Sequence, residues 1–230
     1  MLVNKINTQK TQIVISDIHG QYQTLLRLKE QIKYDESKHQ MIYLGDYIDR
    51  GPQSWEVVEL IQREVKEEEA IALMGNHEKM FLDALRFGKD KKQLWFYNGG
   101  YYSLLKFMEL RSDSTRKQII EFLSGLPLYI ESENYLFVHA GIDPTKTLDE
   151  QTDDDLLWIR EEFLYARDLK KVTDKIVIFG HTPTWYFTGK KEVYFKDDRI
   201  GIDTGAGQGY YLSALILKTH EVHKTKVSNI

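Results

Sequence analysis

One pattern restricts the fold of this chain more than any other: an apolar run that ends in a polar cluster, which occurs six times. The clusters are Asp17/His19, Asp46/Asp49/Arg50, Asn76/His77, His139, His181 and Asp203. Short apolar runs that contain β-branched residues and end at turn residues predict buried strands. Because α/β sheets bind ligands at the carboxyl ends of their strands, the pattern predicts one polar site in an α/β fold.

The stretch from Gly45 to Gly51 is the densest of these clusters, since it holds two carboxylates and a guanidinium within five residues. Asp46 and Asp49 would repel each other unless a cation or Arg50 compensates their charges. Such a group can bind a metal ion together with a phosphate. It can equally be a solvated turn with an Asp–Arg pair, and the stretch alone does not decide between the two.

Composition excludes several classes of protein. The 230 residues are 42% hydrophobic, enough for one substantial core, and we expect one domain over residues 1–230. The net charge of −4 gives no sign of a nucleic-acid partner, and without cysteine there is no disulfide or Cys-type zinc site. The chain begins without an apolar signal segment and has no stretch of membrane-spanning length. We therefore expect a cytoplasmic protein with no membrane partner.

The strands and helices can be placed coarsely from the apolar pattern. Strands are expected at 12–16, 41–44, 70–74, 128–131, 135–138, 175–179, 193–196, 199–202 and 211–217, with a further candidate at 220–226. Between about 79 and 126 the pattern becomes helical, which predicts an insertion between site-bearing strands, where a substrate lid would lie. Its aromatic residues, Trp95 among them, are expected to pack in a helical core and not to stack on a ligand.

The residue types in the six clusters point to a metal site. Asp, Asn and His supply oxygen and imidazole ligands, which suit Mn, Fe, Zn or Ni. Asp17 and His19 are two residues apart, so in extended backbone their side chains leave the same face and can converge on one ion. The set supplies more ligands than one ion needs. Two ions about 3.5–4 Å apart that share a bridging carboxylate would use them all.

Five motifs occur in order along residues 17–182, and a sixth stretch accompanies them. They are Asp17-Ile18-His19-Gly20, Gly45-Asp46-Tyr47-Ile48-Asp49-Arg50-Gly51, Gly75-Asn76-His77-Glu78, His139-Ala140-Gly141 and Gly180-His181-Thr182, with Leu157-Trp158-Ile159-Arg160 between the last two. The series resembles the phosphoprotein phosphatase branch of the calcineurin-like metallophosphoesterases, and Ala140 and the sixth stretch resemble its bacterial and phage members. Ser16 departs from the glycine of many members, but it precedes the ligands.

The resemblance implies a four-layer α/β sandwich of two stacked β-sheets flanked by helices, with a dinuclear metal site at the carboxyl ends of the strands. It also implies a role for each residue of the site. Asp17 and His19 would hold metal 1, Asp46 would bridge both metals, Asn76, His139 and His181 would hold metal 2, Arg50 and Arg160 would bind phosphate, and His77 would be the general acid, oriented by Asp49.

By the same resemblance, the protein is expected to hydrolyse phosphomonoesters with a hydroxide that bridges two divalent metal ions, most plausibly Mn²⁺. Phosphoserine or phosphothreonine in proteins is the expected substrate. Hydrolysis of diadenosine polyphosphates by the same branch is the alternative, and a non-catalytic metal-binding scaffold is a weaker one. Stacking of adenine would need aromatic residues near the site, for which Tyr47, Trp185, Tyr186 and Phe187 are candidates. Asp203 and the glycines after it are expected to form a turn.

Overall fold

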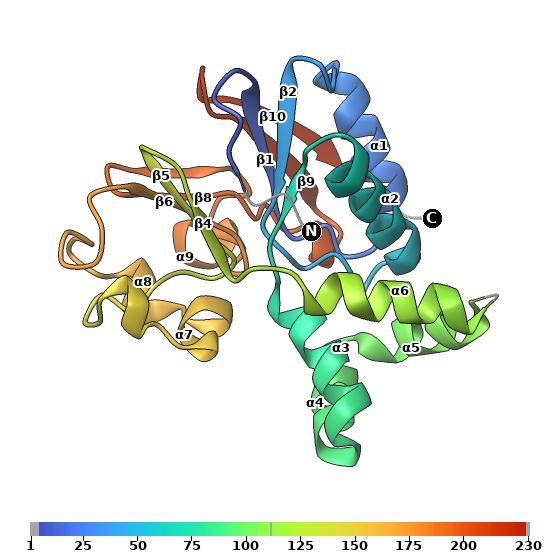
Figure 1. Cartoon of the computed structure of the whole chain (residues 1–230). Coiled ribbons are helices and arrows are strands. Elements are labelled where there is room, and N and C mark those ends of the chain that lie inside the picture. Colours follow the sequence, from blue (N-terminus) through green and yellow to red (C-terminus); the bar gives the residue numbers. More distant parts are fainter. Residues whose placement is uncertain (1–4, 111, 229–230) are drawn as a thin grey trace.

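Two five-stranded sheets form the centre of the molecule in the computed structural model, which describes residues 5–110 and 112–228 (Figure 1). The first sheet has the order β10-β9-β1-β2-β3, with β1 (Thr11–Ile15), β2 (His39–Tyr43), β3 (Ile71–Ala72), β9 (Tyr211–Ile216) and β10 (Glu221–Lys226). The second has the order β4-β5-β6-β8-β7, with β4 (Tyr129–Glu131), β5 (Tyr135–Val138), β6 (Ile176–Phe179), β7 (Tyr194–Lys196) and β8 (Arg199–Gly201).

Each sheet contains three adjacent strands that run parallel and two more that pair antiparallel with their neighbours. In the first sheet β1, β2 and β3 are parallel, β9 pairs antiparallel with β1, and β10 pairs antiparallel with β9. In the second sheet β5, β6 and β8 are parallel, while β4 and β7 pair antiparallel at the two edges. The strand expected at 220–226 is therefore present, as β10.

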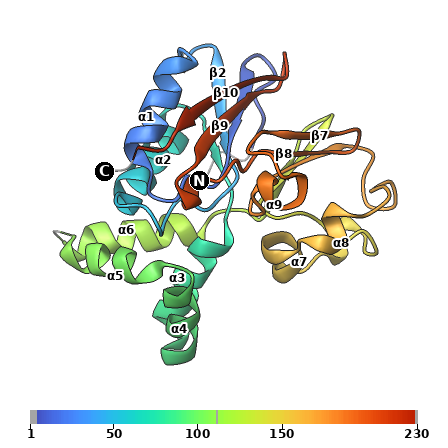
Figure 2. The same ribbon diagram turned by 180° about the vertical axis from the view of Figure 1, so that it is seen from behind.

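The helices surround the two sheets. They are α1 (Tyr22–Gln31), α2 (Ser54–Glu67), α3 (Asn76–Phe87), α4 (Lys89–Tyr97), α5 (Gly100–Glu109), α6 (Asp113–Ser124), α7 (Asp153–Trp158), α8 (Glu161–Leu164) and α9 (Thr184–Thr188). In Figures 1 and 2 α1 and α2 lie against the first sheet, α7 and α8 lie beside the second, and α3 to α6 form a separate group below α2. No helix in the described part of the chain is long and apolar enough to cross a membrane.

Alternation along the strands explains the four layers. Ile13 and Ile15 of β1 belong to a buried cluster with Leu25 of α1 and Val57 of α2. Val14, between them, points to the opposite face and joins a cluster that contains residues of both sheets. Beyond the second sheet, the ring of Phe179 lies 4.9 Å from the ring of Phe163 in α8, between centroids. The expected sandwich of two sheets flanked by helices is thus confirmed.

Two boundaries differ from those expected, both near residue 75. Strand β3 has only two residues instead of the five at 70–74, because the N–H of Met74 bonds the carbonyl of Pro127 and leaves the sheet. The helical region begins at Asn76 and not near 79, because the Glu78 carboxylate accepts the N–H of Gly75 at 3.0 Å and caps the helix. That residues 1–230 form one domain, with 79–126 as an insertion, stays a prediction.

Candidate active site

The carboxyl ends of the six parallel strands bring the predicted polar residues together. Asp17 follows β1, Asp46 follows β2, Asn76 follows β3, His139 follows β5, His181 follows β6 and Asp203 follows β8, and all six are at most 6% exposed. Because the two sheets face each other with these ends on the same side, residues far apart in sequence share one buried cluster. The shared position at strand ends was the main prediction from the sequence.

The backbone of this cluster is unusual. Six of the predicted site residues have positive φ angles: Asp17 (53°), His19 (48°), Asp46 (55°), Asp49 (73°), Arg50 (66°) and His181 (63°). Residues other than glycine rarely adopt this left-handed region, and where they do so together the surrounding structure holds them in place. The strands therefore end in sharp turns that aim the side chains into the site.

Asp46 stands at the centre of the cluster. One carboxylate oxygen, Oδ2, lies 3.5 Å from His19 Nε2 and 3.9 Å from His77 Nε2, and the other, Oδ1, lies 3.4 Å from His139 Nε2. Two sets of possible metal ligands result, one with His19 and His77 and the other with His139 and His181, and Asp46 belongs to both. A carboxylate that belongs to two ligand sets has the position that a bridging ligand requires.

The chemistry of the second set fits a divalent cation. His139 Nδ1 donates to the carbonyl of Leu44 at 2.8 Å, so its Nε2 presents a lone pair. The Oδ1 atom of Asn76 lies 3.0 Å from that nitrogen and 3.1 Å from His181 Nδ1. Hydrogen bonding favours the rotated amide, which donates N–H to both nitrogens, and the amide oxygen is the atom that Asn76 could offer to a cation.

Burial sets the charges of the ligands. It lowers the pKa of His19, His139 and His181, so these imidazoles are neutral, which is the form that binds metal. Burial also raises the pKa of Asp46 well above its usual range, and the neighbouring charge of Asp17 adds to the effect. Cations bound between these carboxylates would favour their ionised form.

The carboxylate of Asp17, the first of the predicted ligands, is hydrogen-bonded within the protein. It accepts the backbone N–H of His181 at 3.0 Å on each oxygen, and it also accepts a hydrogen bond from Ser16. The group of possible ligand atoms that lie within 4.8 Å of one another contains His19, Asp46 and His77 but not Asp17. Asp17 nevertheless belongs to the cluster, because its charge raises the pKa of Asp46 and of Asp203. Its role as a ligand stays a prediction.

His77 lies between a carboxylate and a guanidinium. Its Nδ1 atom is 2.6 Å from Asp49 Oδ2, and its Nε2 atom is 3.0 Å from Arg50 Nη2. The other terminal nitrogen of Arg50 is 2.8 Å from His19 Nε2. Burial raises the pKa of Asp49 to about 7, and burial together with the Arg50 charge lowers the pKa of His77. The predicted acid, its orienting carboxylate and one phosphate-binding arginine are therefore in direct contact.

Arg160 is the second predicted phosphate-binding residue. It is exposed and immediately precedes α8. Its charge lowers the pKa of His139 and of His181, after the larger effect of burial, which places it within electrostatic range of both. The neighbouring Trp158 has its ring centroid 6.0 Å from that of His181. Arg50 thus contacts His19 and His77, while the charge of Arg160 acts on His139 and His181.

Two residues with a structural role in the site were missed by the sequence analysis. The Glu78 carboxylate accepts the backbone N–H of Asp46 (2.8 Å), Tyr47 (2.9 Å), Ile48 (3.2 Å) and Gly75 (3.0 Å). Its place three residues after Gly75 is a capping-box spacing that could have revealed it. Trp95 Nε1 donates to Asp49 Oδ2 at 2.7 Å. No local pattern predicts a contact between residues 46 positions apart.

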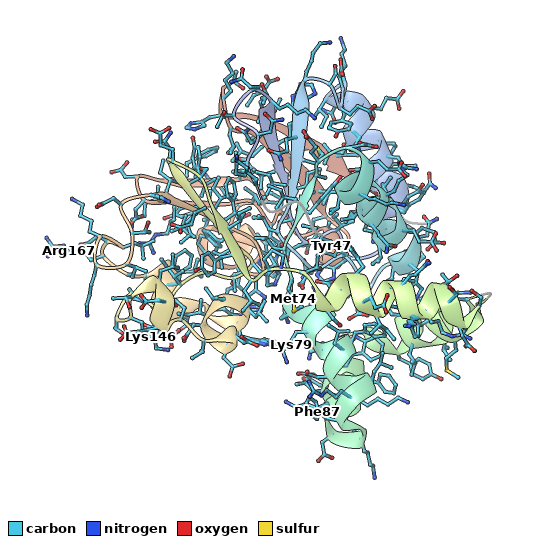
Figure 3. All side chains as sticks on the ribbon, in the orientation of Figure 1. Tyr47, Met74, Lys79, Phe87, Lys146 and Arg167 are labelled. Carbon is cyan, nitrogen blue, oxygen red and sulfur yellow. The ribbon has the colours of Figure 1, made fainter. Side chains whose placement is uncertain are left out.

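Two further expectations concerned Tyr47, as a residue that stacks on adenine, and Asp203, as part of a turn. Tyr47 cannot stack on a base, because it is fully buried and its hydroxyl donates to the carbonyl of Leu73 at 2.5 Å (Figure 3). Asp203 does form the expected turn, since its Oδ1 atom accepts the N–H of Gly205 at 2.8 Å. The glycine-rich segment after it borders the site, because a Cβ atom at Gly207 would collide with His19.

Taken together, the two facing sheets carry buried Asp and His clusters at their strand ends that are suited to divalent metal ions. The chain belongs to the calcineurin-like phosphoesterase family, whose model matches residues 11–208. The family and the two ligand sets that share Asp46 imply that divalent metal ions are its cofactors and a phosphoester its substrate.

Relatives of this chain carry two different activities in their names. It is 30% identical over 209 residues to serine/threonine-protein phosphatase 1 of Salmonella typhimurium, covering 87% of this chain and 88% of that protein. It is also 30% identical over 225 residues to an asymmetrical bis(5'-nucleosyl)-tetraphosphatase of Oceanobacillus iheyensis, covering 87% and 86%. The crystal structure of a candidate diadenosine tetraphosphatase superposes with a TM-score of 0.74 at 21% identity, covering 98% and 97%, which shows a shared fold.

Proposed function

We propose that this protein is a phosphomonoesterase that removes phosphate from phosphoserine or phosphothreonine in proteins. The proposed hydrolysis rests on one observation: His77 contacts both Asp49 and Arg50. These residues lie next to the Asp46 carboxylate, which belongs to two ligand sets. These groups provide a proton donor, a phosphate-binding cation and a place for metal ions within one buried cluster.

Asp17, His19 and Asp46 would hold one divalent ion, and Asp46, Asn76, His139 and His181 would hold the other, with Mn²⁺ the proposed metal. When bound, the ions would polarise the phosphoryl oxygens and lower the pKa of a water that attacks phosphorus. The neutral imidazoles and buried carboxylates described above suit this role. Their near-complete burial also keeps bulk water away from the ligand atoms.

The arginines would bind the phosphate, and Arg50 would then no longer contact Nε2 of His77. In the structure Arg50 donates to the Nε2 atoms of both His19 and His77. A phosphate dianion is a stronger acceptor than an imidazole, so Arg50 would turn to it, together with Arg160. The Nε2 atom of His77 is then free to carry a proton. As the bond from phosphorus to the leaving oxygen breaks, its electron pair stays on that oxygen, which takes the proton from His77.

Two observations support a protein substrate. The similarity to serine/threonine-protein phosphatase 1 covers nearly the whole chain. A cavity of about 490 Å³ also extends from Trp158, beside His181, between α7 and the α3–α4 pair, and its charged lining consists of Lys79, Asp83, Lys91, Asp153 and Asp154. Figure 3 shows Lys79 on the side of α3 that faces α7. Lys79 pairs with both oxygens of Asp83 at 2.8 Å. Charges of both signs suit the flanks of a peptide, whereas the exposed carboxylates of Asp153 and Asp154 oppose a polyphosphate chain.

Dinucleoside tetraphosphates are the second candidate substrate. The relative from Oceanobacillus iheyensis is as similar to this chain as the protein phosphatase is. Tyr102 of α5, which is 46% exposed, lines a cavity of about 430 Å³ together with Arg50. An aromatic ring beside a phosphate-binding arginine could hold an adenine by stacking.

A competition experiment separates the two substrates. The Mn²⁺-loaded protein is assayed with 4-nitrophenyl phosphate while a phosphothreonine peptide or diadenosine tetraphosphate is added, and release of phosphate or nucleotide from each competitor is measured. We expect the peptide to inhibit and to be cleaved. Tight inhibition and cleavage with the dinucleotide, alongside indifference to the peptide, would overturn the proposed substrate but not the phosphoesterase activity.

A further inference from the structure

Helix α4 contacts the carboxylate that orients the acid through a buried hydrogen bond. Trp95 of α4 donates from Nε1 to Asp49 Oδ2 at 2.7 Å, and the same oxygen lies 2.6 Å from His77 Nδ1. Trp95 and Asp49 are both 0% exposed, and His77 is 1% exposed. One carboxylate oxygen therefore meets two donors, one from the imidazole that it orients and one from an indole in another helix.

The indole of Trp95 is held firmly in this position. Its ring centroid lies 5.3 Å from that of Phe81 in α3 and 5.9 Å from that of Phe96 in α4. On another side the backbone of Gly100, the first residue of α5, is so close that a Cβ atom there would collide with the indole ring. Packing on several sides fixes the direction of the N–H, because the ring cannot rotate without displacing these neighbours.

The helical segment α3–α6 also reaches Asp49 and Arg50 through other groups. The N–H of Asp49 donates to Ser54 Oγ at 2.9 Å, and Ser54 Oγ lies 3.1 Å from Ser103 Oγ in α5. Between α4 and α5, Gly99 packs against the side chain of Arg50, since a Cβ atom there would lie 3.2 Å from Arg50 Cγ. The segment thus contacts the carboxylate of Asp49 and the stem of Arg50 directly, and it reaches the backbone of Asp49 only through Ser54 of α2.

We propose that Trp95 is a positioning residue for the general acid, which it serves by fixing the Asp49 carboxylate that orients His77. The inference rests on the proposed function, in which His77 protonates the leaving oxygen. An aspartate carboxylate can turn its oxygens about the Cβ–Cγ bond, and the Trp95 N–H selects one orientation of it. That orientation places Nε2 of His77 toward the phosphate, because Nδ1 is held by Asp49.

The test replaces Trp95 by phenylalanine, which keeps an aromatic ring but removes the N–H. Turnover is measured with phenyl phosphate and with 4-nitrophenyl phosphate, which have similar shapes but leaving groups of different basicity. We expect turnover of phenyl phosphate to fall about tenfold, the worth of one hydrogen bond to a charged group, while turnover of 4-nitrophenyl phosphate changes little. KM for both esters and the bound Mn²⁺ should stay at the wild-type level.

Trp55→Phe is the matched control. Trp55 is buried against the same Phe81 ring, at 5.2 Å between centroids, and its Nε1 donates to the carbonyl of Ser103 at 3.0 Å. The control loses an indole N–H bond in the same aromatic cluster but no bond to Asp49. It should lower thermal stability about as much as Trp95→Phe does, and it should leave the ratio of the two turnover numbers unchanged.

Gly100→Ala provides a second variant should Trp95→Phe not fold. It keeps the indole and suits the first turn of α5, but the added methyl group pushes the ring away from Asp49. We expect the same selective loss with phenyl phosphate. Equal losses with both esters, or no loss with either in the folded variants, would overturn the role of Trp95.

His77→Asn separates this inference from the proposed function. It should cut turnover of phenyl phosphate by about 10²–10⁴-fold, and that of 4-nitrophenyl phosphate less, as expected for loss of a general acid. If it does so while Trp95→Phe behaves like the wild type, only the inference about Trp95 is wrong. If His77→Asn itself shows no preference between leaving groups, the assignment of the acid is wrong, and the role of Trp95 is overturned with it.

Discussion

Glu78 holds the backbone of Asp46: its Oε2 atom accepts the N–H of Asp46 at 2.8 Å, beside two further bonds from Tyr47 and Ile48 to Oε1. The residue that belongs to both ligand sets is therefore fixed by a carboxylate from the first turn of α3. Glu78 is 0% exposed, and burial raises its pKa to about 8. No other described side chain accepts a hydrogen bond from these backbone N–H groups.

We expect Glu78→Gln to lower the free energy of unfolding by about 1–3 kcal/mol, because the amide NH₂ would face backbone N–H groups that lose an acceptor. The metal content after dialysis should fall as well, since the turn that carries Asp46 loosens. Denaturant unfolding and metal analysis measure the two effects.

Glu64→Gln is the control for this prediction. Glu64 is also 0% exposed and accepts the hydroxyl of Tyr43 at 2.6 Å, but it lies in α2, away from the ligands. It should lose stability without losing metal. An equal loss of metal in both variants would show that Glu78 acts on the fold in general and not on the turn of Asp46.

Gly180 lies against the Asp17 carboxylate. A Cβ atom at Gly180 would collide with Ser16 Oγ and Asp17 Oδ2, so we expect Gly180→Ala to displace Asp17 and to weaken the binding of one metal ion. Titration with Mn²⁺ should then resolve a weakened site beside a nearly normal one, and turnover should fall. Gly201→Ala, which crowds Phe179 instead of a ligand, should keep two equal sites. Normal binding of two ions by Gly180→Ala would contradict a ligand role for Asp17.

The sequence indicated that these polar residues share the strand ends because their signal is local. Asp46 and His181 each follow an apolar run and sit beside a glycine, so the chain itself marks the strand end. The three contacts of Glu78 with the turn after β2 needed the fold, since they join residues 30–32 positions apart. The bond between Trp95 and Asp49 needed the exact packing of α4, because aromatic residues on amphipathic helices usually serve the core.

Asp46 and Asp203 offer a matched pair for testing the bridging ligand. Both are buried aspartates that follow parallel strands, and burial raises the pKa of each. We expect Asp46→Asn to abolish turnover and to weaken both metal sites, because one charge that faces two dications is lost. Asp203→Asn keeps the acceptor for the Gly205 N–H and should retain two ions. Metal analysis that finds two ions in Asp46→Asn, with normal turnover, would rule out the bridging role.

The acidic side of the cavity beside Trp158 allows a direct test of the substrate class. Asp153 and Asp154 are exposed in the first turn of α7 and line this cavity. The neighbouring Asp155 instead forms an ion pair with Lys146 and accepts the backbone N–H of Thr152, which caps α7. If a peptide binds there, two negative charges favour basic residues beside the phosphorylated residue. If a polyphosphate binds there, the same charges oppose it.

We therefore expect the double variant Asp153→Asn/Asp154→Asn to raise KM for a phosphothreonine peptide with flanking arginines. The rise should be about two- to tenfold, the usual range for two exposed ion pairs, and it should shrink at high salt. kcat with 4-nitrophenyl phosphate should not change, since that ester does not reach the cavity. Glu56→Gln/Glu59→Gln removes two charges from a separate cavity beside Trp55 and is the control. An unchanged KM for the peptide, together with a lowered KM for diadenosine tetraphosphate, would place a polyphosphate in this cavity and favour the dinucleotide as the substrate.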